Sequence, residues 1–383
     1  MSKIFIVAVE RSGDDLGAGL IKAIRKVDQN ISVTAIGGSA MDEAGAPSQM
    51  SIDGLSILGF VEGIKHYPMI LCKVSECCDQ IIESEADAVI LIDSWGFMIR
   101  VAKKLRKAGF KGKIIKYVAP QVWAMRSGRS KILARYTDLL LSIQPMDKPY
   151  FEPHGLQTVY VGNPVFDTDY RNGSAEKIHR LVKKTDGQIL SVWFGSRASE
   201  IDKLSKDFIE TIKILKSDNP NLLVVSAVAN SVKRSLSSTI KANDADEIIT
   251  LVDEALKKDV MAASDIALAC SGTVTTQLAS AGVPTIVAYR LNGLTYLAAK
   301  KLFKPSYISI VNIAADKGLM PEFIQDEATP SRLSTELTSY LNDPQKRQKA
   351  SQALLSQTRK MGAGSSNRSN EKAANAILTA LQI

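Results

Sequence analysis

The sequence predicts an α/β protein built from two domains. The chain has 383 residues, more than a single hydrophobic core usually organises. Short apolar runs alternate with helical patterns, as in parallel strands that are joined by crossover helices. This alternation stops at a polar stretch, 167–188, and then restarts. We therefore expect two Rossmann-like domains, 1–166 and 189–383, with 167–188 as the linker and a helical region at the C-terminus.

The first domain is expected to hold a sheet of at least five parallel strands. The predicted strands are Ile4–Val9, Ile31–Ile36, Ala88–Ile92, Lys113–Val118 and Leu139–Ile143, with a further apolar run at Thr158–Val161. The predicted helices are Leu16–Val27, Met69–Glu85 and Met98–Ala108. Gly162 and Pro164 follow the last run, and this pair favours the end of the unit.

The second domain repeats the pattern. Its predicted strands are Ile189–Val192, Leu222–Val228, Ile248–Leu251, Ile266–Ala269 and Thr285–Ala288, and a helix is expected at Glu200–Ser217. Residues Thr329–Ile383 are mainly amphipathic helix patterns. Ligands of open α/β sheets bind beyond the carboxyl ends of the strands, so we expect both sheets to face one cleft with those edges.

Composition excludes several classes of protein. Apolar residues make up 45% and charged residues 23%, which is ordinary for a globular protein. No apolar run reaches the roughly 18 residues that span a bilayer. Four cysteines without metal-ligand spacing, and an N-terminus without a signal pattern, favour a reduced cytoplasmic protein without a metal site. The net charge of +8 comes without a nucleic-acid-binding motif, so anionic substrates, an anionic membrane face or a merely basic surface explain it better.

The segment after the first strand is the first candidate site. It reads Glu10-Arg11-Ser12-Gly13-Asp14-Asp15, and it has neither the G-x-G-x-x-G of a dinucleotide loop nor the G-K-S/T of a P-loop. Its carboxylates and hydroxyl suit a ligand's hydroxyl groups better than a pyrophosphate. The alternative is that Ser12 or Asp14 only caps the following helix.

Two segments of the second domain suit an anion. Gly195-Ser196-Arg197 follows one strand and precedes a helix, and its guanidinium matches phosphate geometry. Ser271-Gly272-Thr273 follows another strand and opens a helix whose backbone N–H groups and dipole favour negative charge. Each alone is explained equally well as a helix cap, but two of them at one sheet edge favour a nucleotide diphosphate.

Further candidates stand at other strand ends. Asp93 follows the strand Ala88–Ile92, and Trp123 and Arg126 follow the next one, although these two also fit a rigid turn with a packed aromatic ring. Asn312 follows a short apolar run and by itself reads as a turn residue.

The ordered set of motifs resembles the lipid-A-disaccharide synthase family, inverting glycosyltransferases of GT-B-like fold. The matching segments include VERSGDDLGAGL, IGGSAMDEAG, YVAPQVWAMRSGR, FGSRASEI, CSGTVTTQLA and MPEFIQ, and the resemblance runs from about residue 4 to about residue 326.

The resemblance implies transfer of 2,3-diacylglucosamine from UDP to 2,3-diacylglucosamine 1-phosphate (lipid X). The products would be a β-1,6 disaccharide and UDP, with no metal or other cofactor. The second domain would bind UDP and the first domain the acceptor. Arg197 and Asn312 fall on positions important for activity in the family, and Gln277 replaces a family Glu that suits a ribose. The resemblance also implies a cytoplasmic enzyme that docks on the inner-membrane surface and can form dimers.

Departures from the family pattern cluster at these sites. Gly96 replaces an Asp that is a proposed general base for the acceptor hydroxyl, and Asn163 replaces a His. We expect the base to have moved to Glu10, Asp14 or Asp93. The alternatives are a diverged paralogue that binds without turnover, or a related enzyme with another acceptor.

The segment Leu55–Leu71 is apolar with a few basic residues. It is a candidate for membrane docking or for binding an acyl chain. The alternative is a helix packed on the sheet.

Overall fold

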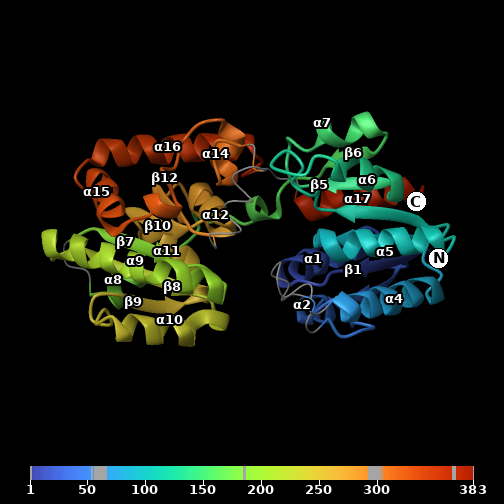
Figure 1. Ribbon diagram of the computed structural model, residues 1–383, viewed down its shortest axis with the longest axis horizontal. Coiled ribbons are helices and arrows are strands. Elements are labelled where there is room, and N and C mark those ends of the chain that lie inside the picture. The colour runs from blue at the N-terminus through green and yellow to red at the C-terminus, as the bar shows by residue number, and fades with distance from the viewer. Residues whose placement is uncertain are drawn as a thin grey trace. The chain divides into compact units, whose positions relative to one another are not determined.

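The computed structural model describes residues 2–52, 55, 67–183, 187–291, 303, 305–364 and 368–382 (Figure 1). The chain divides into two compact units. Unit 1 comprises Met1–Pro164 and Ser366–Ile383, and unit 2 comprises Val165–Ser365. Each unit is built on one parallel six-stranded sheet, so the predicted α/β fold of two Rossmann-like domains is confirmed.

The sheet of unit 1 has the strand order β2-β1-β3-β4-β5-β6, and every pairing is parallel. The strands are β1 (Lys3–Val7), β2 (Ser32–Ile36), β3 (Ala88–Ile92), β4 (Lys113–Tyr117), β5 (Leu139–Ser142) and β6 (Gln157–Tyr160). Every residue of β3 is buried, as expected for a strand with helices on both faces. Since β1, β3 and β4 are neighbours, the segments that follow them lie at adjacent positions on one sheet edge.

Helices cover both faces of this sheet. The helices are α1 (Arg11–Val27), α2 (Ser39–Glu43), α4 (Tyr67–Glu83), α5 (Trp95–Lys107), α6 (Arg129–Tyr136), α7 (Lys148–Phe151) and α17 (Ser369–Leu381), and η1 (Glu152–His154) is a 3₁₀ turn. The apolar sides of α1 and α17 share a core with Ile4 and Ile6 of β1. The apolar sides of α4 and α5 pack with Phe5 and Val7 on the opposite face. This alternation follows the two-residue period of a strand.

The sheet of unit 2 has the order β12-β11-β10-β7-β8-β9 and is also parallel throughout. The strands are β7 (Ile189–Trp193), β8 (Leu223–Val228), β9 (Thr250–Asp253), β10 (Ile266–Cys270), β11 (Thr285–Tyr289) and β12 (Glu322–Ile324). Its central strands β7 and β10 are neighbours, so the Gly195 and Ser271 segments that follow them lie side by side at the carboxyl edge.

The helices of unit 2 also form two layers. They are α8 (Ala175–Leu181), α9 (Ala198–Asp218), α10 (Asn230–Ala242), α11 (Lys257–Ala263), α12 (Thr273–Ala281), α14 (Ile310–Ala315), α15 (Pro330–Leu341) and α16 (Pro344–Lys360), with 3₁₀ turns η2 (Pro164–Asp167), η3 (Glu254–Leu256) and η4 (Gln325–Glu327). One layer contains α9, α10 and α15, and the other contains α8 and α11.

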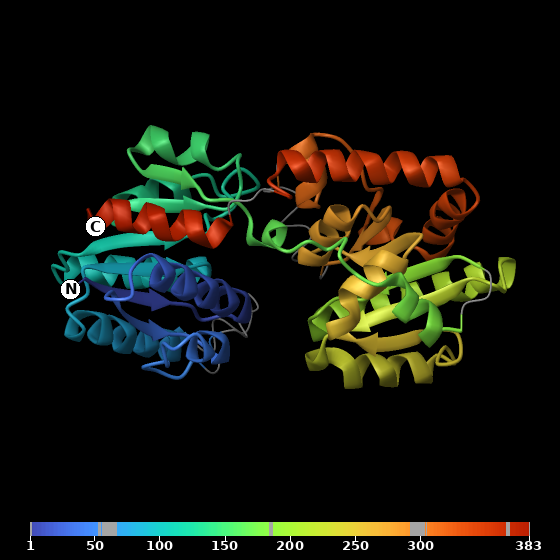
Figure 2. The same ribbon diagram turned by 180° about the vertical axis from the view of Figure 1, so that it is seen from behind.

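The domain boundaries differ from the sequence prediction in two places. Helix α17 was expected in the second domain, but its residues Ala373, Ala374 and Ile377 are fully buried in the core of unit 1 against α1. Lys26 of α1 pairs with Glu371 of α17 at 2.8 Å. Both Figure 1 and Figure 2 show this red helix beside the first strands and helices of the chain. The expected linker 167–188 carries α8, which packs on α11 within unit 2.

Some element bounds also differ. Helix α1 begins at Arg11 rather than Leu16, so the polar segment after β1 is mostly the first turn of a helix. Gly13, in this first turn, packs closely on the sheet: a Cβ atom built there would lie 3.4 Å from Ala8 Cβ and 3.5 Å from Ile92 Cγ2. Strand β9 begins two residues later than predicted, and the short edge strand β12 was not predicted.

Candidate active site

The carboxyl edge of unit 1 brings together two half-buried carboxylates, Glu10 and Asp93. Glu10 is the N-cap residue of α1, and Asp93 follows β3 directly. Among the described residues, neither carboxylate accepts a hydrogen bond that the structure records. Both charges act on Lys116 of the neighbouring strand β4 and favour its ammonium form. Glu10 and Asp93 therefore share one electrostatic environment and keep oxygen lone pairs available.

Asp14 was expected as a third candidate base, but its carboxylate is committed to the fold. It is 5% exposed, and it accepts hydrogen bonds from the backbone N–H groups of Gly38 at 2.8 Å, Ala40 at 2.9 Å and Met41 at 3.2 Å. These donors belong to the start of α2, which has no other side-chain cap. Asp14 thus has a capping role, but it caps α2 and not α1, the following helix that the capping alternative expected. Ser12 is exposed in the first turn of α1.

Trp123, also expected at the site, has a structural role in unit 1. Its side chain is buried, and its indole N–H donates to Asp147 Oδ1 at 3.0 Å. Ser142 donates to the other carboxylate oxygen of Asp147 at 2.6 Å. Burial raises the pKa of Asp147 to about 6, although these hydrogen bonds oppose the shift. Arg126, three residues after Trp123, is exposed and has a left-handed backbone with φ of 56°.

Gly96, at the position of the expected Asp, has space for a side chain. A Cβ atom built there meets only Arg100 Nη1, at 3.6 Å. Gly96 lies in the first turn of α5 and is exposed, and Arg100 donates a hydrogen bond to its carbonyl oxygen. The local backbone therefore does not require glycine here.

In unit 2, the segment after β7 presents an exposed guanidinium. Arg197 is the N-cap residue of α9, and its side chain is 75% exposed. Glu200 fixes the turn by accepting hydrogen bonds from the backbone N–H groups of Ser196 at 2.9 Å and Arg197 at 3.2 Å. Gly195 has φ of +107°, and a Cβ atom there would lie 2.4 Å from Glu200 Oε2, so only glycine fits. Arg197 Nη1 also donates to Glu200 Oε1 at 3.3 Å, so Glu200 holds both the turn and the largely exposed guanidinium.

The neighbouring segment after β10 leaves the start of α12 open. Gly272 and Thr273 are exposed, no side chain caps the helix, and nothing lies within 4 Å of a Cβ atom built on Gly272. Ser271 is half-buried beside them. Gln277, one turn along α12, shares a hydrogen bond with the Tyr170 hydroxyl. The start of α12 and the Arg197 guanidinium thus follow the adjacent strands β10 and β7, at the same edge of the sheet.

Asn312 differs from the expectation of a catalytic role. It is fully buried, and its amide Nδ2 donates to Met320 O at 2.7 Å and to Glu322 Oε1 at 2.8 Å. Its Oδ1 accepts from the backbone N–H groups of Leu319 at 2.9 Å and Met320 at 3.0 Å. All four hydrogen-bonding positions of the amide are therefore used to hold the turn before β12.

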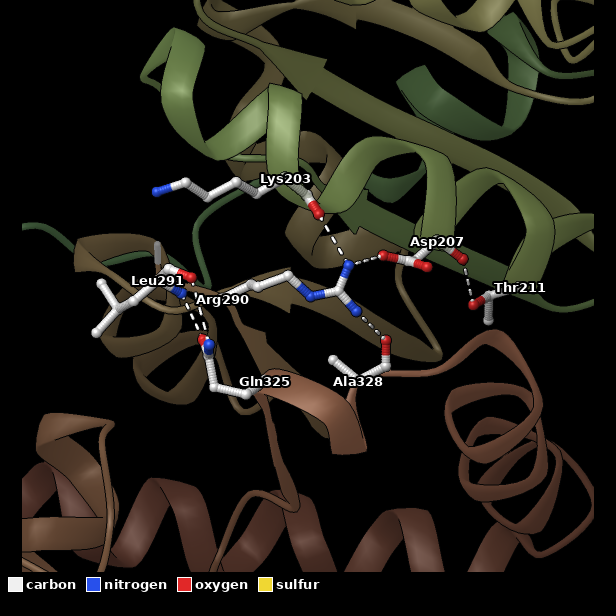
Figure 3. Close-up of polar contacts among 7 residues, drawn as sticks. All are labelled: Lys203, Asp207, Thr211, Arg290, Leu291, Gln325 and Ala328. Atoms are coloured by element: carbon white, nitrogen blue, oxygen red, sulfur yellow. Dashed lines mark hydrogen bonds and ion pairs between the residues drawn. The ribbon is translucent and has the colours of Figure 1, made fainter. Parts of the chain in front are cut away.

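Sequence reasoning missed a polar network at the end of β11. Arg290 donates to the Asp207 carboxylate and the Lys203 carbonyl of α9, and to the carbonyl of Ala328 (Figure 3). Gln325 accepts from the backbone N–H of Leu291 at 2.5 Å and donates to its carbonyl at 3.3 Å. A signal was present in the sequence, because Arg290 stands two residues after the predicted strand Thr285–Ala288 and Gln325 ends the MPEFIQ motif.

This network ties the end of β11 to α9, the helix that begins at Arg197. It joins three sequence-distant segments, and both terminal nitrogens of the guanidinium donate hydrogen bonds. Arg290 therefore holds α9 and the segment before α15 against the end of β11.

Comparison with known proteins decides the family. The model of the family described as Lipid-A-disaccharide synthetase matches residues 4–377. A lipid-A-disaccharide synthase of Rhodospirillum centenum is 36% identical over 380 residues, covering 99% of this chain and 94% of the relative. Those of Pseudomonas aeruginosa and Rickettsia prowazekii are 35% and 34% identical over about nine-tenths of both chains.

The chain belongs to the lipid-A-disaccharide synthetase family. It is an enzyme, a glycosyltransferase that forms the lipid A disaccharide, as the motifs predicted. These relatives all carry the synthase name, and none favours a binding protein without turnover.

Solved structures agree on the fold of this family member. A Staphylococcus aureus MnaA–UDP co-structure aligns with a TM-score of 0.69 at 13% identity, covering 100% of this chain and 97% of that one. A Neisseria meningitidis UDP-GlcNAc 2-epimerase bound to UDP-GlcNAc aligns with a TM-score of 0.64 at 11% identity, with full coverage of both chains.

The expected docking segment Leu55–Leu71 falls largely outside the described residues, which include only Leu55 and 67–71 of it. Leu55 is buried, whereas Tyr67 and Leu71, at the start of α4, are each 45% exposed. In the part of the chain that the structure describes, no helix is both long and apolar enough to span a bilayer.

Proposed function

We propose that the enzyme transfers 2,3-diacylglucosamine from UDP to the 6-hydroxyl of 2,3-diacylglucosamine 1-phosphate. In this proposal the carboxyl edge of unit 2 binds the UDP diphosphate, and the carboxyl edge of unit 1 accepts the proton of the attacking hydroxyl. One observation carries the proposal: the exposed Arg197 and the uncapped start of α12 follow two adjacent strands, β7 and β10.

The donor end is supported by charge and by space. Arg197 offers a guanidinium, and Ser271, Gly272 and Thr273 offer exposed hydroxyl and backbone N–H groups at the positive end of α12. Gly272 lets a phosphate approach the backbone, because no described residue lies within 4 Å of a Cβ atom built there. Solved proteins of this fold carry UDP or UDP-GlcNAc, which supports a uridine nucleotide as the donor. Ser196 and Gln277 are further candidates for donor contacts.

The acceptor end is supported by two carboxylates that accept no recorded hydrogen bond from the part of the chain that the structure describes. Glu10 and Asp93 lie beyond adjacent strands, half-buried, whereas Asp14 is occupied by three backbone donors. Ser12 and Arg126 are exposed near this edge and are candidates for holding the acceptor's hydroxyl and phosphate groups.

The chemistry is a single displacement at the anomeric carbon. The 6-oxygen of the acceptor attacks C1 of the donor sugar as Glu10 or Asp93 takes its proton, and the bond from C1 to the phosphate oxygen breaks. UDP leaves with the electron pair, and Arg197 with the N–H groups of α12 stabilises the negative charge that develops on it. Attack from the face opposite UDP inverts the anomeric centre.

The decisive experiment measures UDP release from UDP-2,3-diacylglucosamine with and without lipid X. We expect release that depends on the acceptor. Arg197→Ala should lower kcat by about 10²–10³-fold, the usual cost of losing one transition-state donor. Glu10→Gln or Asp93→Asn, whichever removes the base, should lower kcat by about 10²–10⁴-fold.

Matched controls test whether charge alone matters. Glu83→Gln changes an exposed carboxylate at the end of α4, and Arg234→Ala removes an exposed cation from α10. Both should keep kcat within about twofold of the wild type. If Glu10→Gln and Asp93→Asn each keep the wild-type rate, the assignment of the base is wrong.

We propose further that α5 and α6 face the anionic membrane that carries both lipid substrates. These two helices contain eight Lys and Arg residues and no Asp or Glu. Aromatic rings lie under several of these cations: Arg100 over Tyr67 at 5.4 Å, and Lys103 over Tyr136 at 5.4 Å. Ile132 on α6 adds exposed apolar surface. Basic and aromatic residues together suit a headgroup layer.

Vesicle sedimentation tests this surface. Binding to phosphatidylglycerol vesicles should exceed binding to phosphatidylcholine vesicles and should weaken with added salt. At about 1 kcal/mol per charge, Lys103→Gln with Arg135→Gln should weaken binding about 30-fold. The matched pair Lys233→Gln with Lys241→Gln on α10 should not, and equal losses from both pairs would show that only net charge matters.

A further inference from the structure

Lys116 is a buried lysine in the middle of an apolar strand. Its residue is 2% exposed within the β4 sequence KIIKY. The ammonium nitrogen donates to three backbone carbonyl oxygens: Leu91 at 3.2 Å, Asp93 at 2.6 Å and Tyr117 at 3.0 Å. An ammonium group has three N–H donors, whereas a neutral amine has two, so these three acceptors match the charged form.

Two of the three carbonyls that Lys116 binds, those of Asp93 and Tyr117, lie in or next to turns with strained backbone. Asp93 and Ser94, after β3, have φ of 49° and 31°, and Val118, after β4, has φ of 71°. Positive φ is uncommon outside glycine and is a genuine outlier for a β-branched residue such as valine. Such conformations persist only where surrounding contacts impose them, and they cluster at functional sites. Lys116 binds the carbonyl of Asp93 itself and that of Tyr117, next to Val118.

The negative charges that act on Lys116 are those of the two candidate bases, Asp93 and Glu10. Asp93 and Glu10 both favour its ammonium form, while burial opposes it and lowers the pKa of Lys116 to about 7. A single buried cation thus touches the backbone of one candidate carboxylate and interacts electrostatically with both.

We propose that Lys116 is a positioning residue for proton transfer, which holds the Asp93 turn and supplies a positive charge that interacts with Asp93 and Glu10. The proposal rests on the proposed function, in which one of these carboxylates removes the proton of the acceptor hydroxyl. It goes beyond that function by making the geometry of the base depend on the protonation of a lysine that never meets the substrate.

The test compares Lys116→Met with the wild type across a pH series of kcat and KM. In the wild type, kcat should fall about tenfold as pH rises through 7 to 9, because the neutral amine releases one carbonyl and loses its charge. Lys116→Met should have kcat lowered at least tenfold at pH 6.5, KM within about twofold, and no such alkaline limb. Lys113→Met, exposed at the start of the same strand, is the matched control and should retain the wild-type profile.

Hydrogen exchange of the wild type provides a readout that needs neither catalysis nor a variant. After correction for the intrinsic pH dependence, backbone amides in residues 93–98 should exchange at least tenfold faster at pH 9 than at pH 6, and those of α17 should not. Equal protection at both pH values would overturn the proposal, as would a Lys116→Met profile parallel to that of the wild type. If the wild type releases no UDP, the proposed function fails, while the exchange result still decides the role of Lys116.

Discussion

Replacing Asp14 by Asn separates a structural carboxylate from a catalytic one. The substitution keeps the size of the side chain but converts Oδ1 or Oδ2 into an N–H donor. Two of the backbone donors, Gly38 and Met41, share Oδ1, while Ala40 uses Oδ2. The amide can accept from the first pair, and its NH₂ group then faces the N–H of Ala40.

The cost follows from these contacts. An orphaned buried N–H costs about 1–3 kcal/mol. The other two hydrogen bonds lose their charge and with it roughly half of their strength, about 0.5–1 kcal/mol each. Asp14→Asn should therefore lower the free energy of unfolding by about 2–5 kcal/mol. Asp28→Asn, at the other end of α1 with a single local contact to Asn30, should lower it by less than about 1 kcal/mol.

The assay pairs urea unfolding with UDP release, measured at a temperature where the variant is fully folded. We expect a clear loss of stability and a kcat within about threefold of the wild type. A general base would give the opposite pattern, with kcat lowered about 10²–10⁴-fold. Unchanged unfolding together with a hundredfold loss of kcat would refute the assignment of Asp14 as a cap.

Four further outcomes are expected. Gly96→Asp should fold normally, because its Cβ position is open, and a faster UDP release would indicate that the new carboxylate serves as base. Between pH 4 and 7, the free energy of unfolding of Asp147→Asn should rise by about 3 kcal/mol relative to that of the wild type. Because burial raises the pKa of Asp147, the wild type loses the stability of the protonated form as pH rises through 6, whereas Asn does not titrate. Parallel curves of unfolding free energy against pH would contradict this prediction. Gly195→Ala should lose most UDP affinity by calorimetry, since its φ of +107° and the Glu200 contact exclude a Cβ atom. Asn312→Ala should lower the thermal midpoint by several degrees, because it orphans buried groups of the turn before β12, and an unchanged midpoint with lost activity would restore a catalytic role.

The sequence by itself determined the fold class, the order of strands and helices, and the family. These follow from local signals: continuous apolar runs for buried parallel strands, helical periodicity between them, and short motifs at the strand ends. It also placed the candidate residues Glu10, Asp93, Arg197 and Ser271–Thr273 at the carboxyl edges of the sheets, because a residue that follows a parallel strand lies at the sheet edge whatever the rest of the chain does.

Only the tertiary structure decided which polar residues remain available. Asp14 accepts hydrogen bonds from residues 24 to 27 positions away, and Asn312 is buried in the turn before β12. The hydrogen-bonding atoms of both side chains are therefore occupied by contacts that no local pattern reveals. Helix α17 joins unit 1 through contacts with α1 some 345 residues earlier. A polar side chain looks the same in the sequence whether it holds the backbone or faces a ligand. The difference is set by long-range burial, which depends on how the whole chain packs.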